Sequence, residues 1–325
     1  MKSMALGAGL ALLLLLSSAA QARGTGYVFV SSEKDDQVVV LDGKTLERVA
    51  AIPTGKRPRW LQFDADKNKL FVAASNSNRI DIIDVASLKV ERSIAGVEDP
   101  EIFDLSTDGR LLYISYEDDA EFGAVEIASG RRVAEVAVGE EPEGVKASPD
   151  GSTVYVTSEV ANMVHVIDAE SFQVKANILV DNRPRRFAIT PDGREVWVTN
   201  ELSGTVSIID AAKNQVVGSI RFQPKGFRPE DVTPVGIVMT GDGRIAYITL
   251  GRANHVAVVD VPSRRITDLV LVGRRAWGLA LSRDESRLFV ANGLSDDLSV
   301  IDTASRRVIK SVPVGRVPHS VVVDD

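Results

Sequence analysis

The chain contains no cysteine and only three histidines among its 325 residues. The lack of cysteine excludes disulfides, thiolate metal sites and the cysteine motif that attaches haem covalently. No phosphate-binding glycine loop, dinucleotide fingerprint or nucleophile motif is present. The net charge is -7, so the chain lacks the surplus of basic residues that is typical of proteins that bind nucleic acid. These absences favour recognition over catalysis, and we predict no catalytic residue, no metal ligand and no nucleic-acid partner.

Long apolar runs are also scarce, and the one that stands out lies at the N-terminus. Lys2 precedes the leucine-rich residues 5–16, and Ala20-Gln21-Ala22 has the small-x-small pattern of a cleavage site. The run is short for a transmembrane helix. We therefore interpret residues 1–22 as a secretory signal peptide, and predict that the mature chain, residues 23–325, has no membrane span.

Apolar runs that end in an acidic residue recur at a nearly constant spacing. The steps between these acidic residues are 42 residues, with one step of 50. The acidic positions are Asp42, Asp84, Glu126, Asp168, Asp210, Asp260 and Asp302. Further apolar runs flank each one, and turns written STDG, SPDG, TPDG and TGDG separate them. Four strands fit each unit, so we predict an all-β, seven-bladed β-propeller of four-stranded blades, with residues 23–325 as a single domain.

The two ends of the chain predict how the ring closes. Residues 318–323 match the innermost strand of a unit, whereas residues 27–30 match the second strand. We expect the C-terminal strand to complete the blade begun at the N-terminus, because this pairing leaves no open sheet edge between the first and last units.

Several motifs resemble those of known propellers. VYVT at 154–157, ITPDG at 189–193 and WVTN at 197–200 resemble the YVTN-type repeat. GFRPEDVTPVG at 226–236, GRANHVAVVD at 251–260 and WGLAL at 277–281 are similar to the PQQ-dependent catabolism-associated β-propeller family. This second resemblance implies a periplasmic protein near PQQ-dependent (quinoprotein) alcohol oxidation, with no established catalytic residue.

That setting implies possible partners rather than an intrinsic cofactor. A periplasmic quinoprotein dehydrogenase or its cytochrome c would be the protein partner, and any association with PQQ would be indirect. We expect the chain itself to be a monomer.

Candidate binding residues follow the recurring proline of each unit. The loops that join successive blades converge at one mouth of a propeller channel. The predicted ring is Arg59, Glu101, Glu143, Arg185, Val235, Trp277 and His319. The loops near Glu101 and Glu143 are acidic, whereas those near Arg59, Arg185 and Arg274 are basic. Such a rim suits a protein partner or a small anion such as PQQ, a tricarboxylate; the alternative is a set of solvated charges that merely pair with one another.

One repeat carries eight extra residues before Pro234. Phe227 beside Arg228 in this insertion suits a protein contact, and Pro224 and Pro229 should stiffen it. A tolerated surface insertion is the alternative.

Two other classes of function stay open. A propeller enzyme of the lactonase or lyase type would use Glu101, Glu143 and His319 with a divalent cation at the mouth. A purely structural envelope module would need neither these catalytic side chains nor a cation. The sequence also leaves Trp277 as either a channel plug or a stacking surface for a ligand.

Overall fold

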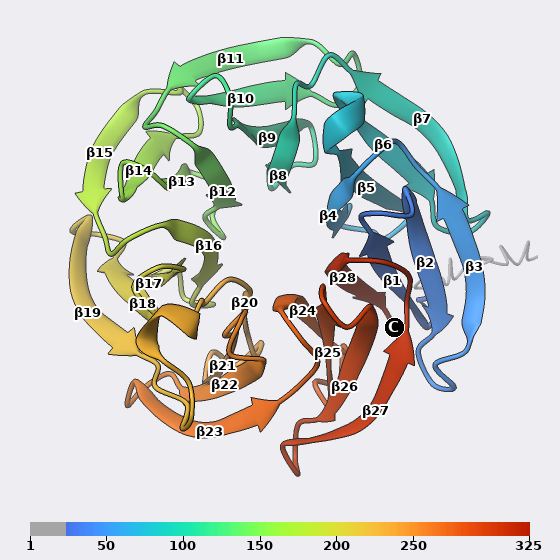
Figure 1. Ribbon diagram of the computed structural model, residues 1–325. Helices are drawn as coiled ribbons and strands as arrows, with labels where there is room; N and C mark the ends of the chain where they lie inside the picture. Colours follow the sequence, from blue (N-terminus) through green and yellow to red (C-terminus); the bar gives the residue numbers. More distant parts are fainter. Residues whose placement is uncertain (1–23) are drawn as a thin grey trace, which may run out of the picture.

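The computed structural model describes residues 24–325, and the predicted signal peptide lies outside them. These residues form seven antiparallel sheets of four strands, arranged as blades around a central channel (Figure 1). The prediction of an all-β seven-bladed propeller is confirmed. The described part also contains two 3-10 helices of three residues, η1 (Ser75–Ser77) and η2 (Pro229–Asp231). No helix within residues 24–325 has the length and apolarity needed to cross a bilayer.

Each blade runs from an inner strand at the channel to an outer strand at the perimeter. The first four blades are β4 (Pro58–Phe63), β5 (Lys69–Ala74), β6 (Arg79–Asp84), β7 (Lys89–Ala95); β8 (Pro100–Leu105), β9 (Leu111–Tyr116), β10 (Glu121–Glu126), β11 (Arg132–Ala137); β12 (Pro142–Ala147), β13 (Thr153–Ser158), β14 (Met163–Asp168), β15 (Val174–Leu179); and β16 (Pro184–Ile189), β17 (Glu195–Asn200), β18 (Thr205–Asp210), β19 (Gln215–Arg221). The others are β20 (Ile237–Met239), β21 (Ile245–Thr249), β22 (His255–Asp260), β23 (Arg265–Leu271); β24 (Ala276–Leu281), β25 (Arg287–Asn292), β26 (Asp297–Asp302), β27 (Arg307–Pro313); and β28 (Pro318–Asp324), β1 (Tyr27–Ser32), β2 (Gln37–Asp42), β3 (Arg48–Pro53).

The ring closes through the two ends of the chain, as predicted. Strand β28 pairs with β1 in an antiparallel ladder that includes Val28 with Val323 (Figure 1). The carboxylate of Asp324 also accepts hydrogen bonds from the Thr25 amide at 2.8 Å and the Thr25 hydroxyl at 2.7 Å. The last blade therefore contains strands from both ends of the sequence.

The recurring acidic residues and Asp-Gly turns have structural roles. The carboxylate of Asp42 accepts hydrogen bonds from the backbone amides of Lys44 at 2.9 Å and Thr45 at 2.7 Å. Gly109 and Gly151 adopt φ angles of 69° and 73°, in the left-handed region that favours glycine. The acidic residues and the glycines thus position turns.

The hydrophobic core consists of seven clusters, one at each interface between neighbouring blades. At one such interface Tyr155 and Val164 pack against Phe187 and Val196 of the next blade. The two middle strands of each sheet are thus buried on both faces, which explains why they are continuously apolar instead of alternating.

A bulge near the start of the inner strands determines which side chains line the channel. In β16 the register shifts between Pro184 and Phe187, and equivalent shifts occur in β4, β8, β12 and β24. The extra residue allows two consecutive side chains to face the channel. Neighbouring inner strands also approach closely: a Cβ atom at Gly144 would lie 2.0 Å from the Arg185 carbonyl oxygen.

Candidate functional site

The predicted ring residues lie at one end of the channel, where the inner strands begin. We call this side of the molecule the mouth face. Arg59, Glu101, Glu143, Arg185 and His319 are each at most 9% exposed, and Trp277 is half-buried. A cavity of about 500 Å³, the mouth cavity, is lined by several of these side chains. The ring exists as predicted, but most of it is buried in the channel wall and not displayed on solvated loops.

The basic and acidic members of the ring neutralise one another. Arg59 Nη1 lies 2.8 Å from a Glu101 carboxylate oxygen, and Arg185 Nη2 lies 2.8 Å from Glu143. Arg57 adds a second contact to Glu101 at 3.2 Å. The arginine forks that the sequence predicted for an incoming anion are therefore already engaged by carboxylates of the chain.

Arg185 is the centre of this network. Besides Glu143 it contacts Glu159, and it lies 3.6 Å from Glu201. Burial raises the pKa of Glu159 to about 7, against the opposing charge of Arg185. Burial acts in the same direction on Glu143, but Arg185 and Arg59 outweigh it and hold the pKa of Glu143 below its usual range.

Glu159 and Glu201 did not emerge from the sequence analysis. They follow the second strand of their blades, at matching positions 42 residues apart. Their turns meet the blade-to-blade loops, since the Glu159 amide donates to the Glu141 carbonyl and the Glu201 amide to the Arg183 carbonyl. Their recurrence at the 42-residue repeat period is the sequence signal that could have identified them as site residues.

His319 is held in its neutral form by its neighbours. Its Nδ1 donates to the Arg59 carbonyl at 3.1 Å, which leaves Nε2 to accept from Arg59 Nη2 at 3.3 Å. Burial and the charges of Arg59 and Arg186 lower the pKa of His319 well below its usual value. The imidazole also packs on Trp277, with ring centroids 5.0 Å apart. Trp277 lies in turn 4.4 Å from the Arg275 guanidinium, so it is part of the wall.

We expect His319 to make the protein less stable in mild acid. The unfolded chain binds a proton at His319 below about pH 6.5, whereas the folded chain does not, so the free energy of unfolding falls as pH falls through that value. In His319→Gln this contribution is absent. The stability difference between wild type and variant should therefore change by about 1.4 kcal/mol between roughly pH 7.5 and pH 5.5, measured by urea denaturation. Parallel pH profiles for the two proteins would contradict this assignment.

Acidic groups on the mouth face converge, but arginines accompany them. Ligand atoms of Asp99, Glu101 and Glu117 lie within 4.8 Å of one another. Arg57 lies 3.6 Å from Asp99 as well as 3.2 Å from Glu101. A cation at this point would have to displace or tolerate a guanidinium.

The insertion is less prominent than the sequence suggested. It lies between β19 and β20, where it was predicted. Phe227 is half-buried and packs edge-to-face on His255, with ring centroids 5.5 Å apart, so it is not a free aromatic contact. Arg228 is exposed and pairs with Asp231 at 3.0 Å and Glu230 at 3.3 Å.

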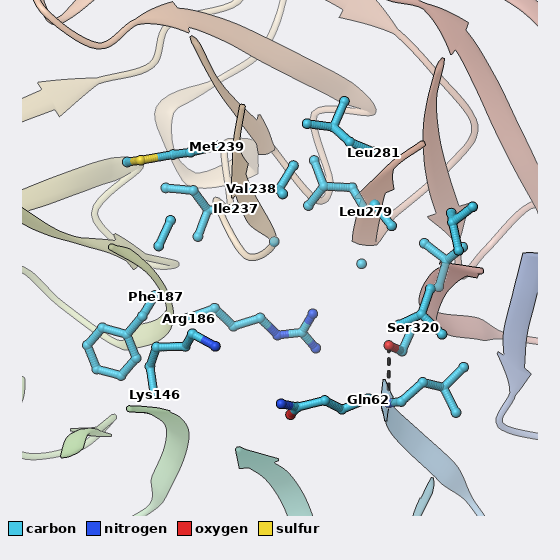
Figure 2. Close-up of a pocket in the computed structure, with 18 of the residues that line it drawn as sticks. Gln62, Lys146, Arg186, Phe187, Ile237, Val238, Met239, Leu279, Leu281 and Ser320 are labelled. Atoms are coloured by element: carbon cyan, nitrogen blue, oxygen red, sulfur yellow. Dashed lines mark hydrogen bonds between the residues drawn. The ribbon is translucent and has the colours of Figure 1, made fainter. Parts of the chain in front are cut away.

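One residue after Arg185, the lining of the channel changes from largely charged to mainly apolar. Arg186 lines a second cavity, of about 750 Å³, at the end of the channel where the inner strands finish (Figure 2). We call it the apolar cavity. Adjacent residues of a strand normally face opposite sides, so a regular strand would turn Arg186 away from the side that Arg185 faces; the bulge in β16 overrides that alternation.

Comparisons with known proteins agree with this architecture. A solved structure of a functionally unknown protein from Desulfotomaculum acetoxidans matches with a TM-score of 0.80 at 16% identity, covering 92% of this chain and 99% of that one. A periplasmic gluconolactonase from Pseudomonas aeruginosa gives 0.77 at 22% identity, with 92% and 99% covered. A putative 6-phosphogluconolactonase from Bacteroides fragilis gives 0.77 at 15% identity, with 93% and 99% covered.

At these identities the solved structures support the fold alone. No functionally curated protein matches the chain. The similarity to the PQQ-associated propellers continues to depend on the sequence motifs. A family model does match across most of the repeats, from residue 60 to residue 314. The chain therefore belongs to the choice-of-anchor I domain family.

Proposed function

We propose that the chain is a non-catalytic binding propeller that docks a protein partner on its mouth face. The observation that carries this proposal is the exposure of large apolar side chains there: Leu202 and Leu294 are each 59% exposed, and both line the mouth cavity. Val160, at the position that corresponds to Leu202 in the preceding blade, is 52% exposed. Exposed apolar side chains that gather on one face and are rimmed by polar residues mark protein interaction sites.

The charges around these leucines favour a partner of defined polarity. Arg252 and Arg274 are exposed and enter no ion pair within residues 24–325. Both arginines lie on the part of the ring that runs from the blade of Leu202 to the blade of Leu294, which also has the exposed Asp296 and Glu230. Glu98 and Glu140 are exposed on other blades. A partner with an acidic surface next to an apolar one would complement the leucine and arginine side.

A small anion is less well supported at this mouth. Arg59 and Arg185 already pair with Glu101 and Glu143, so a tricarboxylate such as PQQ would have to compete with buried carboxylates. Arg252 and Arg274 stay available, but exposed charges of this kind offer little affinity alone. The protein partner is therefore the better reading of this face.

We place this function in the periplasm, as the signal-peptide-like residues 1–22 and the motif similarity imply. The partner we propose is a PQQ-dependent alcohol dehydrogenase or its cytochrome c. The alternative, a lactonase or lyase, has in its favour the convergence of Asp99, Glu101 and Glu117. Against it stand the contacts of Arg57 and Arg59 with Glu101, which occupy the carboxylate that a cation would need.

The double variant Leu202→Ser/Leu294→Ser tests the docking face. The purified dehydrogenase and the cytochrome c of the same organism are each immobilised, and binding is measured by interferometry. We expect the variant to bind at least about tenfold more weakly, because two leucines lose their burial in the interface. Arg252→Ala/Arg274→Ala should slow association and reduce its dependence on salt.

Ile309→Ser is the matched control, since Ile309 is 54% exposed but lies within the outer strand β27. It should bind as the wild type does. The docking proposal fails if neither protein binds the wild type at tens of micromolar, or if Leu202→Ser/Leu294→Ser binds unchanged.

A further inference from the structure

The apolar cavity contains a buried positive charge without a counter-charge. Arg186 is 5% exposed, and its guanidinium enters no ion pair within residues 24–325. Its Nε and Nη2 atoms are buried and have no hydrogen-bond acceptor. Burial lowers the pKa of Arg186 to about 9; the charge of Glu143 opposes this shift, and the charges of Arg185 and Arg59 add to it. Buried charges in proteins are normally paired, so this arrangement is costly unless an acceptor occupies the cavity.

The nearby side chains of Lys146, Asp104 and Gln62 satisfy one another. Lys146 Nζ lies 2.9 Å from Asp104, which also accepts a hydrogen bond of 2.6 Å from Gln62 and backbone bonds from Leu105 and Ala147. The charge of Lys146 is thus balanced by Asp104, whereas Arg186 forms no ion pair within residues 24–325 and feels Glu143 only at longer range. A matching ligand carries a single negative charge.

The remaining wall is mainly apolar, although Arg283 and Glu285 also line it, and the cavity is large enough for an organic molecule. Figure 2 shows the Arg186 side chain reaching across the cavity from β16 towards Ser320, with Lys146 and Gln62 on one side and apolar side chains of β20 and β24 on the other. The apolar lining includes Phe187, Ile237, Val238, Met239, Leu279 and Leu281. A volume of about 750 Å³ is within the range of small-molecule sites.

The Trp60 ring helps to hold the Arg186 guanidinium in place within the cavity. The Arg186 guanidinium lies 4.8 Å from the centre of the Trp60 ring, which supports it from one face. Trp60 Nε1 is likewise buried without an acceptor. A planar carboxylate can accept two parallel hydrogen bonds from a guanidinium, and its apolar substituent can then extend along β20 and β24.

We propose that the apolar cavity binds an organic monocarboxylate with an aromatic or medium-length aliphatic body, its carboxylate on Arg186 and its apolar part against Met239 and Leu281. The site lies at the opposite end of the channel from the mouth face and does not depend on the proposed docking of a protein.

Calorimetric titration of the whole protein tests this assignment with defined probes. The monocarboxylates are octanoate and 3-phenylpropanoate; the neutral isosteres are octanamide and 3-phenylpropanamide; octyl phosphate and PQQ carry more charge. We expect at least one monocarboxylate to bind at least tenfold more tightly than its amide and than octyl phosphate or PQQ. Arg186→Met should weaken that carboxylate at least tenfold and leave the amide unchanged. Without ligand, this variant should melt at a higher temperature than the wild type, because the unpaired charge is gone.

Arg244→Ala is the control, since Arg244 has an exposed side chain and pairs only with Asp242 at 3.8 Å. It should bind the carboxylates as the wild type does. If Arg186→Met fails to fold, Arg186→Lys keeps the charge without the fork and should weaken carboxylate binding several-fold. The proposal is overturned if no monocarboxylate binds at millimolar concentration, if amide or phosphate binds as tightly, or if the folded Arg186 variant binds carboxylate unchanged.

Discussion

A chain that ends at residue 317 should lose its cooperative thermal transition or melt more than about 10 °C below the full-length protein. The deletion removes β28 and leaves β1 without its inner neighbour. Val321 and Val323 also leave the cluster shared with the blade of β24–β27, and Val322 leaves another. Burying three valines is worth about 5–9 kcal/mol, which is comparable with the whole stability of a typical domain.

Circular dichroism melting of both proteins measures this effect. A chain that lacks only Asp325 is the control, because it retains every residue of β28 and should melt within about 2 °C of the wild type. If the chain ending at 317 melts together with the wild type, pairing of the two ends does not hold the ring closed.

Arg185→Met should be the most damaging single substitution in the channel, with a loss of about 3–5 kcal/mol in the free energy of unfolding. Arg185 is 4% exposed, and its removal leaves Glu143 buried without its main partner. Arg183 still reaches Glu159 and Glu201, but it is 39% exposed and lies to one side. Uncompensated buried carboxylates are much more costly than a lost surface pair.

Urea denaturation with a second substitution separates charge from packing. Adding Glu143→Gln to Arg185→Met should recover at least about 1 kcal/mol, because one of the stranded charges is removed. Arg194→Ala breaks an exposed pair with Asp192 and should change stability by less than about 0.5 kcal/mol. A loss below about 1 kcal/mol for Arg185→Met would mean that the network adds little to stability.

The fold was predictable because the repeat period reports it directly. A spacing of 42 residues between acidic positions counts the blades, and the match of residues 318–323 to an inner strand places β28 beside β1. The predicted mouth ring was also located correctly, since Arg59, Glu101 and Glu143 follow the same proline in successive units. Positions equivalent in the repeat are equivalent in the ring.

What the repeat could not provide is the set of contacts between units. Glu159 reaches Arg185 from a different strand connection, so loop charges counted along the chain did not reveal that the rim is internally paired. The Arg186 side chain points into the apolar cavity because of a one-residue bulge in β16, and the spacing of the repeats does not predict this bulge. The packing of Phe227 on His255 likewise joins an insertion to a neighbouring repeat. Pairings of this kind depend on distances of a few ångströms that only the folded ring determines.

The pairing of β28 with β1 also governs when the molecule can finish folding. Thr25 and Asp324 meet across nearly the whole length of the chain, so the blade of β28 and β1–β3 stays incomplete until the final residues have been synthesised. Contacts so distant in sequence form slowly, because a long loop must close before they are made. During synthesis, the unpaired inner edge of β1 can therefore pair with strands other than β28. The ring closes in one late step, when β28 pairs with β1.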